Sequence, residues 1–284
     1  MTLATSSATA TTRDRTPLLL NLAAGAVMAL MLLAAFAPLL APHDPLAQNV
    51  LARLQGPTTA HWLGTDQFGR DILSRVLYGM RASLGIAATS VFAALVAGGS
   101  LGLAAAYYRG WTDRIVMRLM DVLFAFPLML LAIGIIAMLG PGARPTAISI
   151  AIVYTPIFAR LLRGPALVIV TSDYVMSARS IGASDARIIF SHILPNLASV
   201  ILVQLSLLLS SAILVEASLS FLGLGTQPPT PSLGMMLSEG RNMLLLSPWA
   251  AIFSGAAILA IAFALNLLGD VLRDTLDPRL RGQR

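Results

Sequence analysis

The dominant pattern in this chain is a series of long apolar runs separated by short polar segments. A helix needs about 17 to 25 mostly apolar residues to cross the roughly 30 Å hydrocarbon core of a bilayer. Six stretches reach that length, and they are 18–40, 83–107, 120–139, 146–162, 197–219 and 249–268. The pattern therefore predicts an all-α, polytopic membrane protein with six transmembrane helices.

Composition supports a protein whose main solvent is lipid. The chain is 57% hydrophobic and 11% charged, whereas soluble domains carry about 25% charged residues. Cysteine is absent from the sequence, which excludes disulfides and thiolate metal sites. Every basic side chain is an arginine. The formal net charge of +6 fits the enrichment of basic residues in the cytoplasmic loops of membrane proteins, so we expect no nucleic-acid partner.

The arginines give the predicted orientation. If the N-terminus is inside, thirteen arginines fall in cytoplasmic segments and six in outer segments. Cytoplasmic loops of membrane proteins are enriched in Lys and Arg. Both termini are therefore expected in the cytoplasm.

This topology divides the chain into five predicted parts. They are a disordered cytoplasmic N-terminus (1–17), a first transmembrane helix (18–40), an extracytoplasmic segment (41–82), a five-helix core (83–272) and a cytoplasmic tail (273–284). A cleaved signal peptide is the alternative for the beginning, because Arg13 and Arg15 precede an apolar run. The run of 18–40 is longer than the about 7–15 residues of a signal-peptide core, which favours an uncleaved span.

Three local patterns predict further structure. Apolar residues at helical spacing over 72–80 predict an amphipathic helix on the membrane surface, with a ligand contact as the alternative. Ala94, Gly98 and Gly102 recur every four residues, which is typical of a helix-packing seam. The segment 233–246 suits a short surface helix with Glu239 and Arg241 exposed.

No catalytic or metal motif is recognisable. His43, His61 and His192 lie in separate stretches on opposite sides of the predicted membrane, and neither HExxH nor a histidine pair at i,i+4 occurs. A Walker A loop is excluded because the sequence contains no lysine. We therefore expect a non-catalytic chain without a cofactor or metal site.

Acidic residues near the span ends need an explanation, because ionisable groups inside a membrane are costly. Asp121, Glu216 and Asp270 lie near such ends, so interfacial placement or pairing with arginine is favoured over a proton relay. An ion-coupled secondary transporter would normally need an acidic group near the midplane. That function stays open as an alternative, as does a membrane scaffold that recruits a soluble partner.

The polar segment 173–196 is the most informative interruption of the apolar pattern. Residues 174–181 suit one short helix, Gly182 suits the position just after its end, and Ser184 suits the N-cap of a second helix over 185–192. Five apolar side chains exceed what a solvated loop needs, and they are Tyr174, Ile181, Ile188, Ile189 and Phe190. The segment is expected either to rest on lipid headgroups or to insert into a groove of a cytoplasmic partner.

This segment resembles the EAA loop of ABC importer permeases, whose pattern is E-A-A, three residues, G, nine residues, I-x-L-P. The tripeptide positions hold Met176, Ser177 and Ala178, followed by Gly182 and by Leu194-Pro195. Met176, Ser177 and His192 replace the Glu, the Ala next to it and the first Ile of the pattern. Three further segments, 61–84, 216–241 and 268–282, are similar to the dipeptide/oligopeptide/nickel branch of that family and to its C-type subunit.

The resemblance implies a fold, partners and a site. The fold is that of a type I ABC importer permease with a cytoplasmic coupling helix, located in a bacterial inner membrane. The implied partners are a second homologous permease, two cytoplasmic ATPases that hydrolyse ATP, and an extracytoplasmic solute-binding protein. The implied coupling residues are Met176, Ser177, Ala178, Arg179, Gly182, Ala183, Ser184, Leu194 and Pro195. The expected function is import of peptides or a related small solute.

Overall fold

The computed structural model describes residues 16–276, and over this range the chain is helical without a strand. The long helices are α2 (Thr16–Ala35), α4 (Ile72–Tyr108), α5 (Gly110–Phe124), α6 (Leu128–Leu139), α7 (Ala143–Val170), α11 (Ala198–Phe221) and α13 (Trp249–Leu276). The short elements are α3 (Ala37–Leu40), η1 (Val50–Ala52), α8 (Asp173–Ser180), α9 (Asp185–Ile188), η2 (Ile189–Ile193), α10 (Leu194–Asn196) and α12 (Leu233–Asn242). The all-α prediction is confirmed. Most of the predicted N-terminal region and C-terminal tail lies outside the described residues.

Four helices are long and apolar enough to cross a membrane, namely α4, α7, α11 and α13. They correspond to four of the predicted spans, and each of them is longer than the span it matches. The first predicted span, 18–40, corresponds to α2 followed by α3.

The third predicted span, 120–139, is wrong as a single straight helix. α5 ends at Phe124 and α6 begins at Leu128, and their axes differ by 90°. Pro127 lies at this break, and proline both lacks an N–H donor and disfavours α-helical backbone in the preceding residue. By length and composition, the described residues therefore hold four helices that could cross a membrane, or five if this bent pair counts as one, in addition to α2 and α3 in the first predicted span.

The predicted surface helix over 72–80 is also wrong as a separate element. It forms the first turns of α4, which continues without a break for 37 residues. Ile72, Val76 and Met80 are buried in the main core, and Arg75 is buried as well. Asp71 caps the helix by accepting a hydrogen bond from the Ser74 N–H at 2.8 Å. This apolar face therefore packs against protein instead of lying on lipid.

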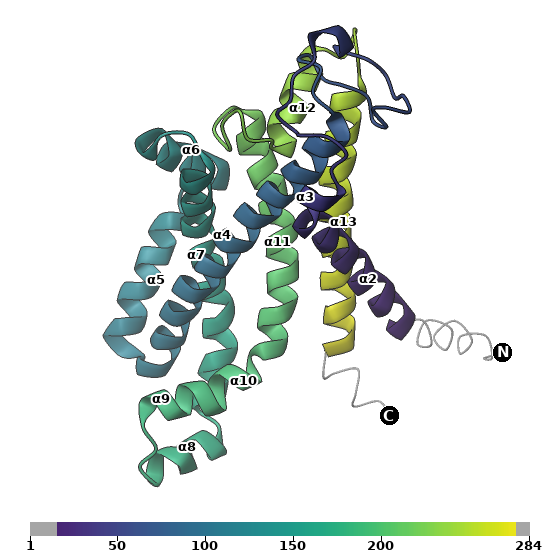
Figure 1. Cartoon of the computed structure of the whole chain (residues 1–284). Coiled ribbons are helices and arrows are strands. Elements are labelled where there is room, and N and C mark those ends of the chain that lie inside the picture. The colour runs from purple at the N-terminus through teal and green to yellow at the C-terminus, as the bar shows by residue number, and fades with distance from the viewer. Residues whose placement is uncertain (1–15, 277–284) are drawn as a thin grey trace, which may run out of the picture.

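The predicted seam on the second span is confirmed as a contact between α4 and α7. A Cβ atom added to Gly98 would collide with the carbonyl oxygen of Thr155, and one added to Gly102 with that of Ala159. Only glycine at these positions allows the two backbones to approach so closely. Figure 1 shows α4 crossing alongside α7, with α11 and α13 forming the other side of the bundle.

Residues 41–71 fold over one end of the bundle and are joined there to α12 by buried charges (Figure 1). Arg70 pairs with Asp66 at 2.6 Å and with Glu239 of α12 at 3.4 Å. Arg75 lies 3.4 Å from Asp66 and 3.5 Å from Glu239. The prediction of an exposed Glu239 is therefore wrong, because two arginines from a distant segment hold it.

The three acidic residues predicted near span ends have different surroundings. Asp121 pairs with Arg160 at 2.6 Å, which confirms the expected pairing with an arginine. Glu216 is fully buried and accepts a hydrogen bond from Ser220 at 2.7 Å, so its predicted interfacial placement is wrong. Asp270 is exposed.

Candidate functional site

The candidate site is the hairpin made by α8, α9, η2 and α10, which projects from the end of the bundle opposite α12 (Figure 1). α8 ends in a Schellman motif. The Gly182 N–H donates to the Arg179 carbonyl at 3.0 Å, and the Ala183 N–H donates to the Ala178 carbonyl at 3.1 Å. Gly182 has φ +82°, a left-handed conformation that favours glycine. The glycine turn predicted from the sequence is confirmed.

The second half of the hairpin begins as predicted and then changes its hydrogen bonding. Ser184 caps α9, because its hydroxyl accepts a hydrogen bond from the Arg187 N–H at 3.4 Å. From Ile189 the helix continues as a π-helical turn, and the Leu194 N–H donates to the Ile189 carbonyl five residues back. Pro195, which has no N–H to donate, follows at once in α10.

One face of the hairpin is packed against the ends of the long helices. Val175, Ile188 and Ile193 are at most 1% exposed. They belong to a second apolar cluster with Ala106, Tyr107, Leu162, Ala166, Val170 and Leu197. At about 25 cal/mol per Å² of apolar surface, burying three such side chains contributes several kcal/mol. The hairpin is therefore held in a defined position on α4 and α7.

Two polar contacts add to this packing at Tyr107, near the end of α4. The Tyr107 hydroxyl donates a hydrogen bond to the Asp185 carboxylate at 2.6 Å. The guanidinium of Arg179 lies 5.0 Å from the centre of the Tyr107 ring, a cation–π distance. One tyrosine thus contacts both halves of the hairpin. The sequence pattern did not predict this role of Tyr107. The residue is the last of the predicted span 83–107, and hydropathy does not relate the end of a span to a segment far along the chain.

Away from this packed face, the hairpin exposes four large apolar side chains among polar ones. Met176, Ile181 and Phe190 are 59%, 86% and 67% exposed, and Tyr174 is 46% exposed. The five apolar residues singled out in the sequence are therefore divided, because Ile188 points into the protein and Ile189 is half-buried. Fold stability gains nothing from these exposed side chains, which makes them a candidate interaction surface.

The predicted coupling residues lie on this hairpin in two groups. Those around the glycine turn are mostly exposed, while Ala178 and Ala183 are half-buried. Leu194 and Pro195 lie at the far end, next to α11, with Leu194 half-buried and Pro195 exposed. The exposed members of the first group are Met176, Ser177, Arg179, Gly182 and Ser184.

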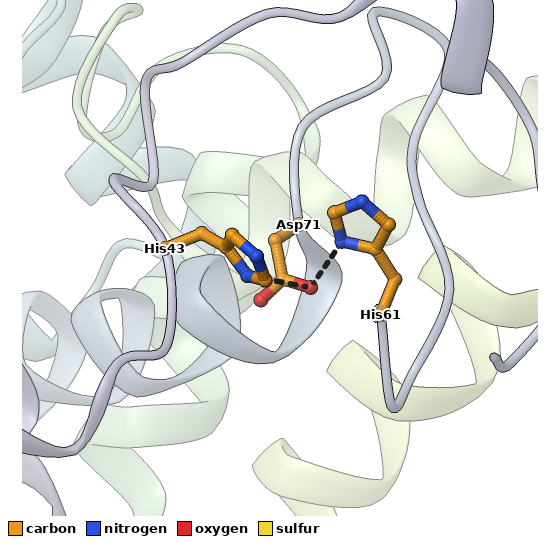
Figure 2. Close-up of side chains that lie close together, drawn as sticks. All are labelled: His43, His61 and Asp71. Atoms are coloured by element: carbon orange, nitrogen blue, oxygen red, sulfur yellow. Dashed lines mark hydrogen bonds and ion pairs between the residues drawn. The ribbon is translucent and has the colours of Figure 1, made fainter. Parts of the chain in front are cut away.

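The structure also corrects the placement of the histidines. His43 and His61 are 18 positions apart in the sequence, yet their ring centres lie 4.8 Å apart. Asp71 lies between them (Figure 2). No spacing rule for short motifs identifies such a group, because the loop between the histidines has no regular period.

Comparison with known proteins is consistent with this architecture. Residues 98–282 match the family described as binding-protein-dependent transport system inner membrane component. A solved structure of the MetNI methionine ABC transporter in an inward-facing conformation aligns with a TM-score of 0.59 at 16% identity. The alignment covers 72% of this chain and 98% of that one, and it supports the fold alone.

Closer relatives are found among curated proteins. The glutathione transport system permease protein GsiD of Pectobacterium atrosepticum is 49% identical over 256 residues, covering 90% of this chain and 85% of the relative. The dipeptide transport system permease protein DppC of Alkalihalophilus pseudofirmus is 45% identical over 255 residues, covering 90% and 84%. The chain therefore belongs to the binding-protein-dependent transport system inner membrane components, the permease subunits of ABC importers.

Proposed function

We propose that this permease subunit imports small peptides and that its hairpin 173–196 transmits the movements of cytoplasmic ATPases to the transmembrane helices. The observation that carries the proposal is the two-faced hairpin. Val175 and Ile188 anchor it to α4 and α7, while Met176, Ile181 and Phe190 present an apolar surface to a partner. An element that is fixed on one side and free on the other passes a displacement on to the helices behind it.

The proposed ATPase contact centres on the glycine turn. Gly182 has open space around it, so a partner groove can approach its backbone closely. Met176, Ser177, Ala178, Arg179, Ala183 and Ser184 surround the turn, and Leu194 and Pro195 connect the hairpin to α11. A short helix in an apolar groove is a common mode of peptide recognition. ATP-driven closure of the two ATPases would move this hairpin and favour one of two orientations of the spans.

Peptides are proposed as substrates because the similar permeases serve small-peptide systems. The two relatives are named for transport of glutathione and of dipeptides. These solutes share peptide bonds, a free carboxylate and a small size. A tripeptide or dipeptide is therefore the substrate class to test first.

In the assembly we propose, this chain pairs with a second permease subunit. Two ATPases bind on the cytoplasmic side and a solute-binding protein on the outer side. In this assembly the hairpin lies in the cytoplasm, in agreement with the arginine distribution of the sequence. The end that carries α12 then faces outward. Both chain termini are placed in the cytoplasm by the same reasoning.

The proposal is tested by reconstitution with the proposed partner subunits. Wild-type assemblies in liposomes should take up dipeptide or glutathione only with ATP and the binding protein. Gly182→Arg should still insert and assemble, but uptake and substrate-stimulated ATP hydrolysis should fall by about tenfold or more, because a long charged side chain blocks the proposed groove.

Two variants separate this effect from backbone strain. Gly140→Arg is the matched control, since Gly140 also has a positive φ (+86°) and open surroundings but lies at the end of α6. Gly182→Asn tests strain alone, because asparagine tolerates the left-handed conformation. Both should transport at near wild-type rates. Normal uptake by Gly182→Arg, or uptake on an ion gradient without the ATPases, would contradict the proposal.

A further inference from the structure

Three segments of the chain meet beside the first residue of α4. His43 follows α3, His61 belongs to the loop after η1, and Asp71 is the N-cap of α4. Figure 2 shows the two imidazole rings on either side of the Asp71 carboxylate. Among residues 16–276, these are the three potential metal ligands that come within 4.8 Å of one another.

The distances between the ligand atoms suit a small metal ion. Nδ1 of His61 lies 3.0 Å from Oδ1 of Asp71, and Nδ1 of His43 lies 3.8 Å from the same oxygen. Two ligands of a tetrahedral zinc ion, each bonded at about 2.0–2.2 Å, lie about 3.4 Å apart. The two observed distances lie on either side of that value. A small rotation of the His43 ring, which is 42% exposed, would adjust the longer one.

The carboxylate is already oriented for such a role. Asp71 is 2% exposed, and its Oδ2 accepts hydrogen bonds from the Ser74 N–H and hydroxyl, both at 2.8 Å. The Ser74 hydroxyl in turn accepts a hydrogen bond from the backbone N–H of His43 at 3.1 Å. These contacts leave Oδ1 facing both rings. Metal sites use such outer partners to fix the orientation of their ligands.

We propose that His43, His61 and Asp71 form a binding site for a divalent transition-metal ion such as Zn²⁺. Two imidazole nitrogens and one carboxylate are a common zinc ligand set, with water in the fourth position. Ca²⁺ and Mg²⁺ prefer oxygen ligands and fit this group poorly. The exposed side of His43 leaves the fourth position open to solvent.

A bound ion would clamp the polar segment onto the transmembrane bundle. The three ligands are spread over 43–71, a segment with little regular structure of its own, and Asp71 begins the longest helix. The site lies at the end of the molecule opposite the hairpin 173–196 (Figure 1). It is therefore independent of the proposed coupling to ATPases, and either proposal can fail alone.

The test is a titration of the purified full-length chain, in detergent and without a histidine tag. Zn²⁺ competition against a chromophoric chelator should show one bound ion per chain, and Co²⁺ should give the visible absorption bands of a tetrahedral site. His43→Gln and His61→Gln should each weaken binding by more than the roughly 10- to 100-fold that loss of an outer-shell partner costs. His192→Gln, which removes the remaining histidine far from the site, should bind like the wild type.

The proposal is overturned if the wild type binds no ion stoichiometrically at micromolar Zn²⁺. Unchanged affinity in both His43→Gln and His61→Gln would also overturn it, and would leave the two histidines as hydrogen-bonding neighbours of Asp71. Size-exclusion profiles establish that each variant is folded. If His61→Gln aggregates, His43→Gln alone decides, because its more exposed ring makes fewer packing contacts.

Discussion

Tyr107 is the residue through which the long helix α4 contacts both halves of the hairpin. Its hydroxyl binds Asp185 at 2.6 Å, and its ring faces the Arg179 guanidinium. The side chain is 6% exposed, while Asp185 and Arg179 are exposed. The tyrosine is therefore the rigid partner, and it orders two charged side chains that would otherwise move freely in solvent. This contact sets the position of the exposed apolar face.

Tyr107→Phe should loosen the hairpin without unfolding the bundle. The variant loses one hydrogen bond to a carboxylate that can return to water, a cost of about 1 kcal/mol. Amide hydrogen exchange over 173–196 should then become about fivefold faster. Tyr108→Phe is the matched control, because Tyr108 is the neighbouring residue and is 57% exposed. Equal exchange in both variants would show that the hydroxyl does not hold the hairpin.

At the scale of elements, the contact between α4 and α7 organises the bundle. Gly98 and Gly102 lie one turn apart on α4 and meet the carbonyls of Thr155 and Ala159. α7 keeps its helix through Pro156 and Pro165. Proline inside a membrane helix is tolerated where neighbours supply partners for the freed backbone groups. The seam therefore joins two helices that each depend on close packing.

Gly102→Ala should destabilise the protein although alanine is the better helix former. The added methyl group would collide with backbone at Ala159, and overpacking of this kind costs about 1–3 kcal/mol. The gain in helix propensity is about 1 kcal/mol at most. Thermal unfolding in detergent should show a lower midpoint for Gly102→Ala. Gly85→Ala, on the same helix but in open space, should match or exceed the wild-type midpoint.

A lower midpoint in both variants would mean that glycine is needed for the flexibility of α4. In that case the close approach to α7 would not be the reason for Gly102. The two substitutions make the same chemical change on the same helix. They differ in what the new methyl group meets.

At the scale of the whole molecule, α4 connects two specialised ends. Its N-cap, Asp71, lies beside His43 and His61, and its last turn carries Tyr107, which contacts the hairpin. A helix of 37 residues is about 55 Å long, enough to span the bilayer and project beyond it. A buried charge cluster joins the polar segment and α12 at the first end, and an apolar cluster joins α8 and α9 to the bundle at the other.

Glu239→Ala should separate the polar segment from α12. Arg70 and Arg75 would each lose a carboxylate partner while remaining buried, at a cost of about 1–3 kcal/mol. Limited proteolysis of 41–71 should become faster, and the unfolding midpoint should fall. Asp270→Ala removes an exposed carboxylate near the other end and should change neither property. Wild-type resistance to protease in Glu239→Ala would show that Asp66 alone neutralises the two arginines.

Much of the architecture was predictable because it depends on local patterns. The helical class, the spans inside α4, α7, α11 and α13, the glycine turn at Gly182 and the cap at Ser184 all follow from periodicity or from preferences of single residues. The resemblance of the hairpin and of three other segments to ABC importer permeases led to the same family that the comparisons identify. These signals lie within short windows of sequence.

The features that sequence reasoning missed all depend on contacts between distant segments. The fusion of 72–80 with the following span, the burial of Glu216 and the pairing of Glu239 require knowledge of what packs against each residue. The bend of 90° at Pro127 is the exception, because proline is a local signal. A hydropathy pattern measures how apolar a segment is and does not identify its neighbour.

The sequence by itself determined that this protein is a helical membrane protein, because lipid imposes a length and polarity on every crossing helix. Its resemblance to ABC importer permeases, and not its hydropathy, indicated the family. Only the tertiary structure decided which side of the hairpin is free and that His43, His61 and Asp71 meet. Side chains far apart in sequence come together through the folding of irregular loops and the crossing of helices. Contacts of this kind leave no periodic pattern in the sequence, so only the folded structure shows them.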